Sequence, residues 1–520
     1  MQRITSMIDT GSDHINRCVR RRKSGGRHAS DHADVRKQPV QRKWWVMDLD
    51  ESESNRTSGK VPIGRSAYDT LEEVIDRIGM NPVHLRILLI AACGGLFNVI
   101  EQYNIGYAAP LLVEQWDLSA RSVAWLSSAT FLAMAVGSVV SGIYADRLGR
   151  EPLFIVNILI YSVGALIAAF APNYEVLLLV RVIVGIGLGG EMALGYTLVA
   201  EFIPRRQRAA SSATMSLMHG GVGIWAASLL AAVILGPVAA VLGHPEYAWR
   251  ILLGVMVFPA ILALIARRSM PETPRFLLRA HRIDELNLTL TALMQKRIRL
   301  GAGDDVTVFV EPGTRPEDDP AARLRDLFHP KLLRKNLIAS VLATTLFAGV
   351  ASLTVYVPTV LVDLGYEASS AAAISTLITF GGLLGGVIGI VVGHRLPRRF
   401  VLATCALTSA IALAVLVAHQ TTLLVVVLGF ATALALQVFS GSFWGYLPEL
   451  YPTRVRALGV AFATTVGLVV GASLGPLLAG TLLDTFGSTT MFTALAAVML
   501  VMPTAAVFGP ETHRRALSED

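Results

Sequence analysis

The sequence predicts an all-α integral membrane protein with twelve membrane-spanning helices in two pseudo-symmetric halves of six. The first observation is composition: the 520 residues are 53% hydrophobic and 16% charged, whereas soluble domains carry about 25% charged residues. The second is the recurrence of apolar runs of 18 or more residues, each long enough to cross ~30 Å of hydrocarbon as a helix. Continuous runs exclude a membrane β-barrel, which alternates in segments of about ten residues.

The third observation is a pair of motifs that recur at one offset of 248 residues. The stretch Glu201-Phe-Ile-Pro-Arg-Arg-Gln-Arg208 returns as Glu449-Leu-Tyr-Pro-Thr-Arg-Val-Arg456. At the same offset, the stretch from Gly142 to Arg150 corresponds to Ile390-Val-Val-Gly-His-Arg-Leu-Pro-Arg398. Parallel repeats of apolar segments are typical of transporters whose substrate site lies between the two halves.

The spans divide the chain into six regions. We expect a disordered basic cytoplasmic tail over 1–68 and an amphipathic helix on the membrane surface over 69–83, which starts with a capping box at Thr70. The two six-helix halves are expected at 84–268 and 336–508. A cytoplasmic loop at 269–335 joins them, and a cytoplasmic tail follows at 509–520. The expected spans are 86–112, 121–144, 153–171, 176–201, 209–235, 249–268, 337–362, 370–393, 400–417, 422–446, 458–482 and 489–508.

The basic residues predict the orientation. Ten arginines lie in the short connections after the second, fourth, eighth and tenth spans, and one or two in the connections after odd-numbered spans. Because Lys and Arg concentrate in cytoplasmic loops, both termini are expected in the cytoplasm and the protein in the plasma (inner) membrane. The net charge of +7 is therefore explained without nucleic acid as a partner.

The stretch Gly142-x-x-x-Asp146-Arg147-x-Gly149-Arg150 predicts a gate. Gly142 would let two helices approach closely, and the carboxylate and guanidinium groups would form ion pairs in one conformation only. The second copy has His394 in place of the aspartate, so the first half is expected to carry more of the gate. We assign the same role to Glu191, Glu201, Arg208, Arg395, Glu449, Arg454 and Arg456, with Glu191 expected to lie near Arg147, Glu201 and Arg208.

These motifs resemble those of the major facilitator superfamily, over residues about 70 to 513. The branch is narrowed by Arg181-Val-Ile-Val-Gly-Ile-Gly-Leu-Gly-Gly-Glu191, Pro271-Glu-Thr-Pro-Arg275, Pro448-Glu-Leu-Tyr-Pro-Thr-Arg454 and Pro510-Glu-Thr512. Together they resemble the sugar-porter and synaptic-vesicle-glycoprotein-like branches and their bacterial metabolite:proton symporter relatives. The resemblance implies the major facilitator fold and alternating access.

Two departures from the family pattern bear on the substrate. Proton-coupled sugar porters carry a titratable Asp where this chain has Asn104, and facilitative members carry Asn, so Glu101 is the candidate for proton coupling. Sugar porters also carry two glutamines in the seventh span, where alignment places Thr345 and Leu346. A pocket without that amide pair is a poor fit for hexose, so sugar ranks second among the substrates.

Charged residues inside spans are costly and face a cavity or a partner. We hypothesise that Glu101 and Arg181 share a cavity, in which Arg181 binds a substrate carboxylate or pairs with Glu101 when the cavity is empty. His219 is either a proton relay or a donor to a backbone carbonyl. The glycines between Arg181 and Glu191 are expected to provide close helix contact. Further candidates for the substrate site are Tyr103, Tyr356, Gln437 and Trp444.

The sequence therefore predicts a secondary transporter that moves a small carboxylate-bearing or aromatic metabolite with protons. Alternatives are a facilitative or proton-coupled sugar transporter, a multidrug or metabolite exporter, and, from another class, a membrane receptor without transport. No nucleophile–base spacing, metal cluster or phosphate loop stands out in the sequence, so we expect no enzyme, no cofactor and no metal. The protein is expected to act as a monomer.

Overall fold

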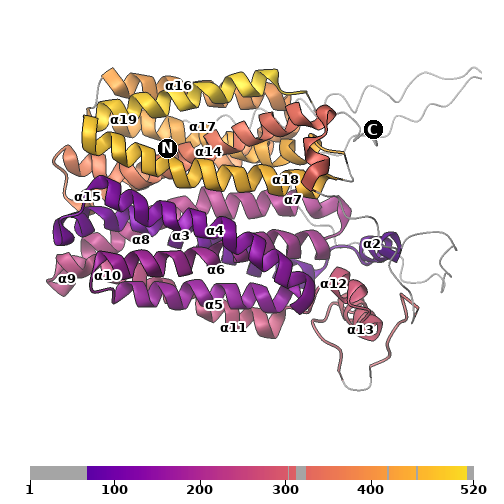
Figure 1. Cartoon of the computed structure of the whole chain (residues 1–520). Coiled ribbons are helices and arrows are strands. Elements are labelled where there is room, and N and C mark those ends of the chain that lie inside the picture. The colour runs from indigo at the N-terminus through magenta and orange to yellow at the C-terminus, as the bar shows by residue number, and fades with distance from the viewer. Residues whose placement is uncertain (1–66, 302–303, 312–323, 419–420, 453–454, 512–520) are drawn as a thin grey trace, which may run out of the picture. The chain divides into compact units, whose positions relative to one another are not determined.

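The computed structural model describes residues 67–301, 304–311, 324–418, 421–452 and 455–511, and these form helices and connecting loops without a strand. Figure 1 shows two layers of helices side by side, one from each half of the chain. Nearly all of the tail predicted at 1–68, and most of the Pro-rich segment of the central loop, lie outside the described residues.

The first half consists of six membrane-length segments that start at Pro82. Several of these are continuous helices and two contain π- or 3₁₀-helical turns. In order they are α3 (Pro82–Trp116), α4 (Ala120–Leu148), α5 (Arg150–Ala169), α6 (Tyr174–Phe202), then α7 (Arg205–Ser216), η1 (Leu217–Val222), α8 (Gly223–Val233), η2 (Ile234–Val238) and α9 (Ala239–Leu242) as one segment, and η3 (Pro245–Tyr247), α10 (Ala248–Gly254), η4 (Val255–Val257) and α11 (Pro259–Ser269) as the last.

The second half repeats this arrangement after the central loop. Its helices are α14 (Pro330–Asp363), α15 (Ala368–Arg395), α16 (Arg398–Ala418), α17 (Thr422–Glu449), α18 (Arg456–Val466), η7 (Gly467–Ser473) and α19 (Leu474–Phe508). The described residues contain 11 membrane-length apolar helices, but the last, Leu458–Phe508, has 51 residues. It is broken at Gly487, where φ is +81°, so it supplies the eleventh and twelfth of the expected spans.

Glycines decide how the first half packs. A Cβ on Gly185 would lie 2.4 Å from the carbonyl oxygen of Thr130, and one on Gly189 would lie 1.9 Å from that of Met134. Only hydrogen side chains therefore let α6 lie directly on α4. This confirms the expected role of the glycine run. Gly142, in contrast, is exposed, and a Cβ added there would have nothing within 4 Å, so the expectation that it brings two helices together was wrong.

The packing preserves the offset found in the motifs. A Cβ on Gly137 would lie 2.1 Å from the Ile186 carbonyl oxygen, and a Cβ on Gly385 would lie 2.3 Å from that of Leu434. Both members of the second pair stand 248 residues after those of the first. The α4–α6 contact of one half is thus reproduced as the α15–α17 contact of the other.

The helix α2 (Ala67–Ile78) differs from its prediction in two ways. Its apolar residues Leu71, Val74 and Ile75 are buried in the protein core instead of facing a membrane surface, and Thr70 lies inside the helix, not at its start. Glu72 accepts hydrogen bonds from Arg205 and, at 3.2 Å, from Arg275. Through Glu72, the short helix therefore connects the segment that follows α6 to the segment that follows α11.

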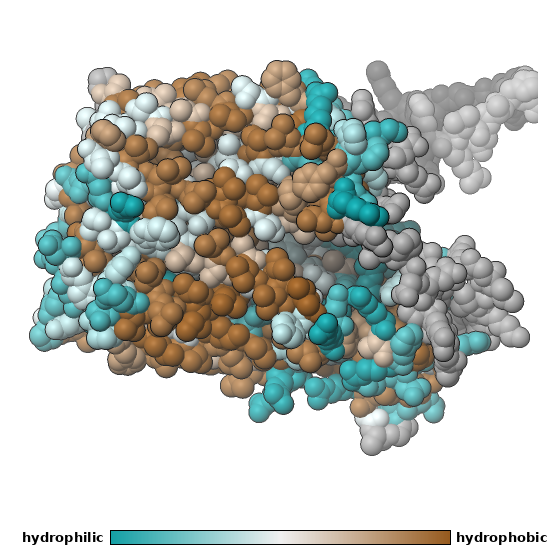
Figure 2. All heavy atoms as spheres, viewed as in Figure 1, coloured by the Kyte–Doolittle hydropathy of each residue, from teal (hydrophilic) through white to brown (hydrophobic). Residues whose placement is uncertain are grey.

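The central loop contains two further helices, α12 (Pro274–Arg279) and α13 (Ile283–Met294). They lie with α2 at the end of the bundle that carries the connections after α4 and α6, which we call the motif end (Figure 1). Apolar side chains cover the flank of the bundle between two more polar ends (Figure 2). This apolar belt is the surface that a bilayer requires.

Replacing Gly189 with Ala should lower the thermal stability of the protein, because the added methyl group would meet the Met134 carbonyl oxygen. Overpacking of this kind costs about 1–3 kcal/mol. Unfolding of detergent-purified protein, followed by intrinsic fluorescence, measures the effect. Gly142→Ala is the matched control, and equal stability of the two variants would contradict this account of the α4–α6 contact.

Candidate functional site

A buried ion pair joins α3 to α6 in the first half. The Arg181 Nη1 group donates to Glu101 Oε1 at 2.5 Å, and both side chains are completely inaccessible to solvent. Arg181 Nη2 also lies 3.4 Å from the Glu101 backbone carbonyl oxygen, and Nε donates to Thr130 Oγ1 at 3.1 Å. The guanidinium is therefore engaged on two neighbouring helices.

Glu101 is less completely satisfied than Arg181. Its Oε2 atom is buried and has no hydrogen-bond partner among the described residues. Removing one partner of a buried ion pair costs about 3–5 kcal/mol, because the other charge is left uncompensated. A proton on Glu101 would weaken the attraction and free part of the guanidinium, so this pair has the chemistry of a proton-dependent contact.

Glu191 lies elsewhere than expected. Its side chain is completely buried, and Asn98 Nδ2 donates to Glu191 Oε2 at 2.6 Å. The same amide donates to the Leu188 carbonyl oxygen at 2.7 Å. Within the described part of the chain Glu191 forms no ion pair, so its assignment to a network with Arg147, Glu201 and Arg208 was wrong. No sequence signal pointed to Asn98, whose amide ties α3 to α6.

Three other candidates of the first half have mainly packing contacts. Tyr103 is buried and its ring packs against Phe131, with centroids 6.2 Å apart. The Asn104 amide donates to the Leu252 carbonyl oxygen at 3.2 Å and so links α3 to α10. His219 is half-buried in the π-helical turn η1, beside Gly95 of α3.

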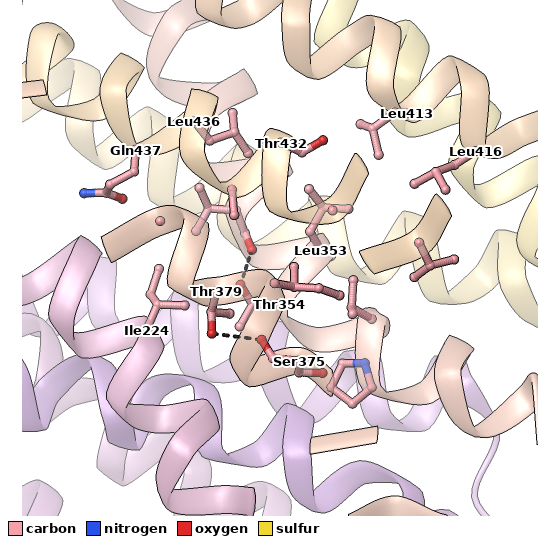
Figure 3. Close-up of a pocket in the computed structure, with 18 of the residues that line it drawn as sticks. Ile224, Leu353, Thr354, Ser375, Thr379, Leu413, Leu416, Thr432, Leu436 and Gln437 are labelled. Carbon is pink, nitrogen blue, oxygen red and sulfur yellow. Dashed lines mark hydrogen bonds between the residues drawn. The ribbon is translucent and has the colours of Figure 1, made fainter. Parts of the chain in front are cut away.

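A cavity lies between the two halves and extends into the second. It encloses about 790 Å³ of empty space, part of which is open to solvent. Figure 3 shows Ile224 from the first half facing it, with Thr354, Ser375 and Thr379 from the second. The lining is mainly aliphatic, and its polar side chains are Tyr107, Thr354, Ser375, Thr379, Thr432 and Gln437.

The cavity lining contains no charged side chain. Glu101 and Arg181 therefore share a contact, as hypothesised, but not this cavity, which differs from the expected arrangement. The helix α3 connects the two features, because Tyr107 stands six positions after Glu101, about 9 Å along the helix axis. A movement of α3 would therefore change both the ion pair and the cavity lining.

Hydroxyl groups join the halves beside the cavity. Ser228 Oγ of α8 lies 2.7 Å from Thr379 Oγ1 of α15, and Thr379 also donates to the Ser375 carbonyl oxygen at 2.9 Å. Sequence reasoning missed Tyr107, Ser228 and Thr379. Single hydroxyls on apolar helices recur throughout the chain, so only the packing distinguishes these from the others.

The candidates of the second half separate into three environments. Gln437 lines the cavity and packs on Gly220 of the first half, where an added Cβ would lie 2.5 Å from its Nε2. Trp444 stacks on Tyr196 across the halves, with ring centroids 6.3 Å apart. Tyr356 is outside the lining, and its hydroxyl donates to the Pro476 carbonyl oxygen at 2.9 Å. Only Gln437 of this group is therefore placed to contact a bound substrate.

The two halves are joined at the end opposite the motif end. Asp484 of α19 accepts hydrogen bonds from the backbone N–H groups of Ala120 and Arg121, at 2.8 and 2.7 Å. A carboxylate at the start of α4 also interacts favourably with the helix dipole. Further along the interface, Ser128 Oγ donates to the Ser473 carbonyl oxygen at 2.5 Å, and Ser473 Oγ donates to that of Ser128 at 3.0 Å.

The predicted gate of the first half is a network centred on Arg150. Its guanidinium pairs with Asp146 at 3.1 Å and with Glu201 at 3.3 Å. Asp146 also accepts from Arg279 of α12, at 2.9 Å. Arg147 is exposed, and the Nε atom of Arg208 is buried without a partner among the described residues, so these two do not join the network.

Glu272, from the stretch after α11, completes this network. Its Oε1 atom accepts from the backbone N–H of Arg150 at 3.1 Å and of Thr273 at 2.8 Å. A Cβ on Gly149, where φ is +105°, would lie 2.0 Å from Glu272 Oε2, so glycine is required for the carboxylate to reach the start of α5. Burial raises the pKa of Glu272, and these N–H donors oppose the shift.

The second half has a corresponding arrangement. Arg398 pairs with Glu449 at 3.3 Å, and Glu511 accepts from the backbone N–H groups of Arg398 and Arg399 at 3.2 and 3.3 Å. Arg456 Nε donates to the Tyr451 carbonyl oxygen at 3.4 Å. Arg395 is exposed, and Arg454 and the side chain of His394 lie outside the described residues.

Comparison with known proteins decides the family. The family model described as "Sugar (and other) transporter" matches residues 87–519. The chain belongs to this family. It is therefore a major facilitator transporter and not an enzyme. Two solved structures share the fold. A D-xylose-proton symporter has a TM-score of 0.63 and 18% identity, over 82% of this chain and 98% of its own. A bacterial homologue of the human lysosomal transporter Spinster has a TM-score of 0.61 and 16% identity, over 83% of this chain and 97% of its own.

Three similar curated proteins are bacterial transporters of small metabolites. The niacin transporter of Acinetobacter baylyi is 27% identical, over 85% of this chain and 98% of its own length. The gallate transporter of Pseudomonas putida is 30% identical over 79% and 88% of the two chains. An inner membrane metabolite transport protein of Escherichia coli is 28% identical over 82% and 91%.

Asp146→Asn should lower the transport rate more than His394→Asn, because it removes the charge that pairs with both Arg150 and Arg279. Initial rates of labelled-substrate exchange in proteoliposomes, corrected for the amount of protein inserted, measure the difference. Equal losses in the two variants would refute the unequal contribution of the halves to the gate.

Proposed function

We propose that this transporter carries a small aromatic organic acid across the inner membrane together with protons, by alternating access. The main support for proton coupling is the buried ion pair of Glu101 and Arg181. Glu101 Oε1 and Arg181 Nη1 lie 2.5 Å apart, and both side chains are inaccessible to solvent. The cavity and the similar proteins support the choice of substrate. The Lys and Arg bias of the short connections supports a cytoplasmic position for both termini.

The pair provides a way to couple a proton to a movement of helices. While Glu101 is ionised, Arg181 holds α3 against α6, and Thr130 extends the contact to α4. Protonation of Glu101 removes the ion pair in a site with little water, where electrostatic interactions are strong. The two states then differ in how α3 packs, and α3 also supplies Tyr107 to the cavity. Asn104 cannot titrate, so Glu101 takes the role that Asp has in proton-coupled sugar porters.

The cavity suits a flat, mainly apolar molecule with one polar end. Aliphatic side chains would contact a ring, and the Gln437 amide with the Thr379 and Ser375 hydroxyls would bind a polar group. Similar proteins transport niacin and gallate, both aromatic rings with a carboxylate. Entry of one anion against a negative-inside potential costs about 2.3 kcal/mol per 100 mV, and one proton per carboxylate removes this cost.

Sugar transport ranks second for a structural reason. Thr345 and Leu346, which replace the glutamine pair of sugar porters, are buried and do not line the cavity. A hexose has a hydroxyl group on nearly every carbon, and each of them needs a partner when it leaves water. The six polar side chains of the lining include a single amide.

Glu101→Gln should abolish accumulation of substrate driven by a pH gradient and leave exchange of labelled for unlabelled substrate largely intact. Glutamine keeps the shape and can still accept from Arg181, but it cannot release a proton. Uptake by proteoliposomes with and without an imposed gradient measures the first process, and counterflow measures the second. The candidate substrates are niacin, gallate, aliphatic acids and sugars in separate pools.

The control for this experiment is Glu175→Gln, which makes the same substitution at an exposed position in the first turn of α6. It should accumulate substrate like the unmodified protein. If Glu101→Gln retained gradient-driven accumulation with an unchanged pH profile, Glu101 would not be the coupling residue. Exchange without accumulation in the unmodified protein would indicate a facilitative transporter.

Gln437→Leu should raise the KM for exchange by at least about tenfold, since a lost hydrogen bond to a charged group is worth about 1.5–3 kcal/mol. The pH dependence of transport should stay the same, because Gln437 does not contact Glu101. Initial exchange rates over a range of substrate concentrations test this. An unchanged KM would remove Gln437 from the binding site.

A further inference from the structure

A second cavity lies at the motif end of the second half, and one of its lining residues, Arg399, also donates its backbone N–H to Glu511. It encloses about 880 Å³ of empty space, part of it open to solvent. Four of its nine lining residues are basic: Lys331, Arg334 and Lys335 from α14, and Arg399 from α16. The others are Ile338, Val507, Phe508, Gly509 and Pro510. We call this the basic pocket.

The basic residues lie near the starts of two helices, where positive side chains are unfavourable. α14 begins at Pro330 and α16 at Arg398, and neither has an acidic residue in its first turn. The start of a helix carries a partial positive charge, which repels cations and attracts anions. Two helix starts and four cationic side chains thus border one cavity, and an anion bound there would relieve their mutual repulsion.

The protein itself supplies a carboxylate nearby, Glu511, to the start of α16. Glu511 accepts from the backbone N–H groups of Arg398 and Arg399. At the start of α14, the side-chain cap is His329, whose Nδ1 atom accepts from the Lys331 N–H at 3.5 Å. None of the lining residues of the basic pocket is acidic. The positive charge of α14 is therefore not balanced within the lining.

Apolar side chains next to the basic pocket face outward. Phe508 is 66% exposed and Leu337 is 64% exposed. These residues belong to long apolar helices and stand at the edge of the apolar belt, where headgroups meet acyl chains. The pocket thus has a basic side and an apolar side, and a lipid molecule would occupy both.

The geometry points to a binding site for an anionic phospholipid, with the phosphate among Lys331, Lys335 and Arg399 and an acyl chain along Val507 and Phe508. A basic pocket between membrane helices on the cytoplasmic side is a known means of binding anionic headgroups. A free phosphate ion would use the same cations but gain nothing from the apolar side. The proposal stands whether or not the transported substrate is an acid.

The test is thermal unfolding of the full-length protein in detergent during titration with phosphatidylglycerol. Phosphatidylcholine, with no net charge, and inorganic phosphate are titrated in parallel. The variant Lys331→Gln/Lys335→Gln/Arg399→Gln removes three charges from the basic pocket. It keeps Arg334, which donates to the Phe508 carbonyl oxygen at 3.0 Å. The matched control Arg77→Gln/Arg267→Gln/Arg268→Gln removes three charges from exposed positions elsewhere.

We expect phosphatidylglycerol to raise the unfolding midpoint of the unmodified protein and of the control at the same concentrations. The basic-pocket variant should need at least about tenfold more, since each basic residue near an anionic headgroup contributes about fivefold in affinity. Equal responses of the two variants would show only nonspecific attraction and overturn the site. Equal stabilisation by inorganic phosphate would overturn its assignment to a lipid.

Discussion

A charge that is buried among membrane helices needs its counter-charge inside the protein, and the first half is arranged around that requirement. Hydrocarbon offers Arg181 no hydrogen bonds, so Glu101 and Thr130 satisfy it from two other helices. These contacts depend on how closely α6 approaches α4. Glycines at the crossing make the approach possible, and the packing of the half and its solvent-inaccessible ion pair thus depend on the same helix.

The two halves pack their helices in the same way but differ in the charged and polar side chains that they carry. The glycine contacts of α4 with α6 and of α15 with α17 correspond at the motif offset. Carboxylates from Glu272 and Glu511 likewise bind the starts of α5 and α16. The first half, however, has the buried ion pair and the larger gate network, while the second lines most of the cavity. One half thus holds the buried ion pair and the other most of the cavity lining.

Fold class, the twelve spans and the packing of the glycine run in α6 could be predicted from the sequence, because hydrocarbon thickness and helix geometry limit what an apolar run can form. The contact between Glu101 and Arg181 was predictable for a similar reason, since charges inside spans are few. The partners of Glu191, the contacts of Asp484 opposite the motif end and the hydroxyls of the cavity were not. They depend on helix rotation and depth, which hydropathy leaves open, and Asn98 or Thr379 looks like many other polar residues on apolar helices.

The carboxylates that follow α11 and α19 have a consequence for how the protein moves. Glu272 ties the end of the first half back to its own third span, and Glu511 does the same in the second half, so each six-helix unit is closed upon itself at the motif end. Bending within a unit would break these closures, whereas rotation of one unit against the other leaves them intact. Relative rotation of the two units would instead break bonds between them, such as those that Asp484 accepts from the backbone N–H groups of Ala120 and Arg121.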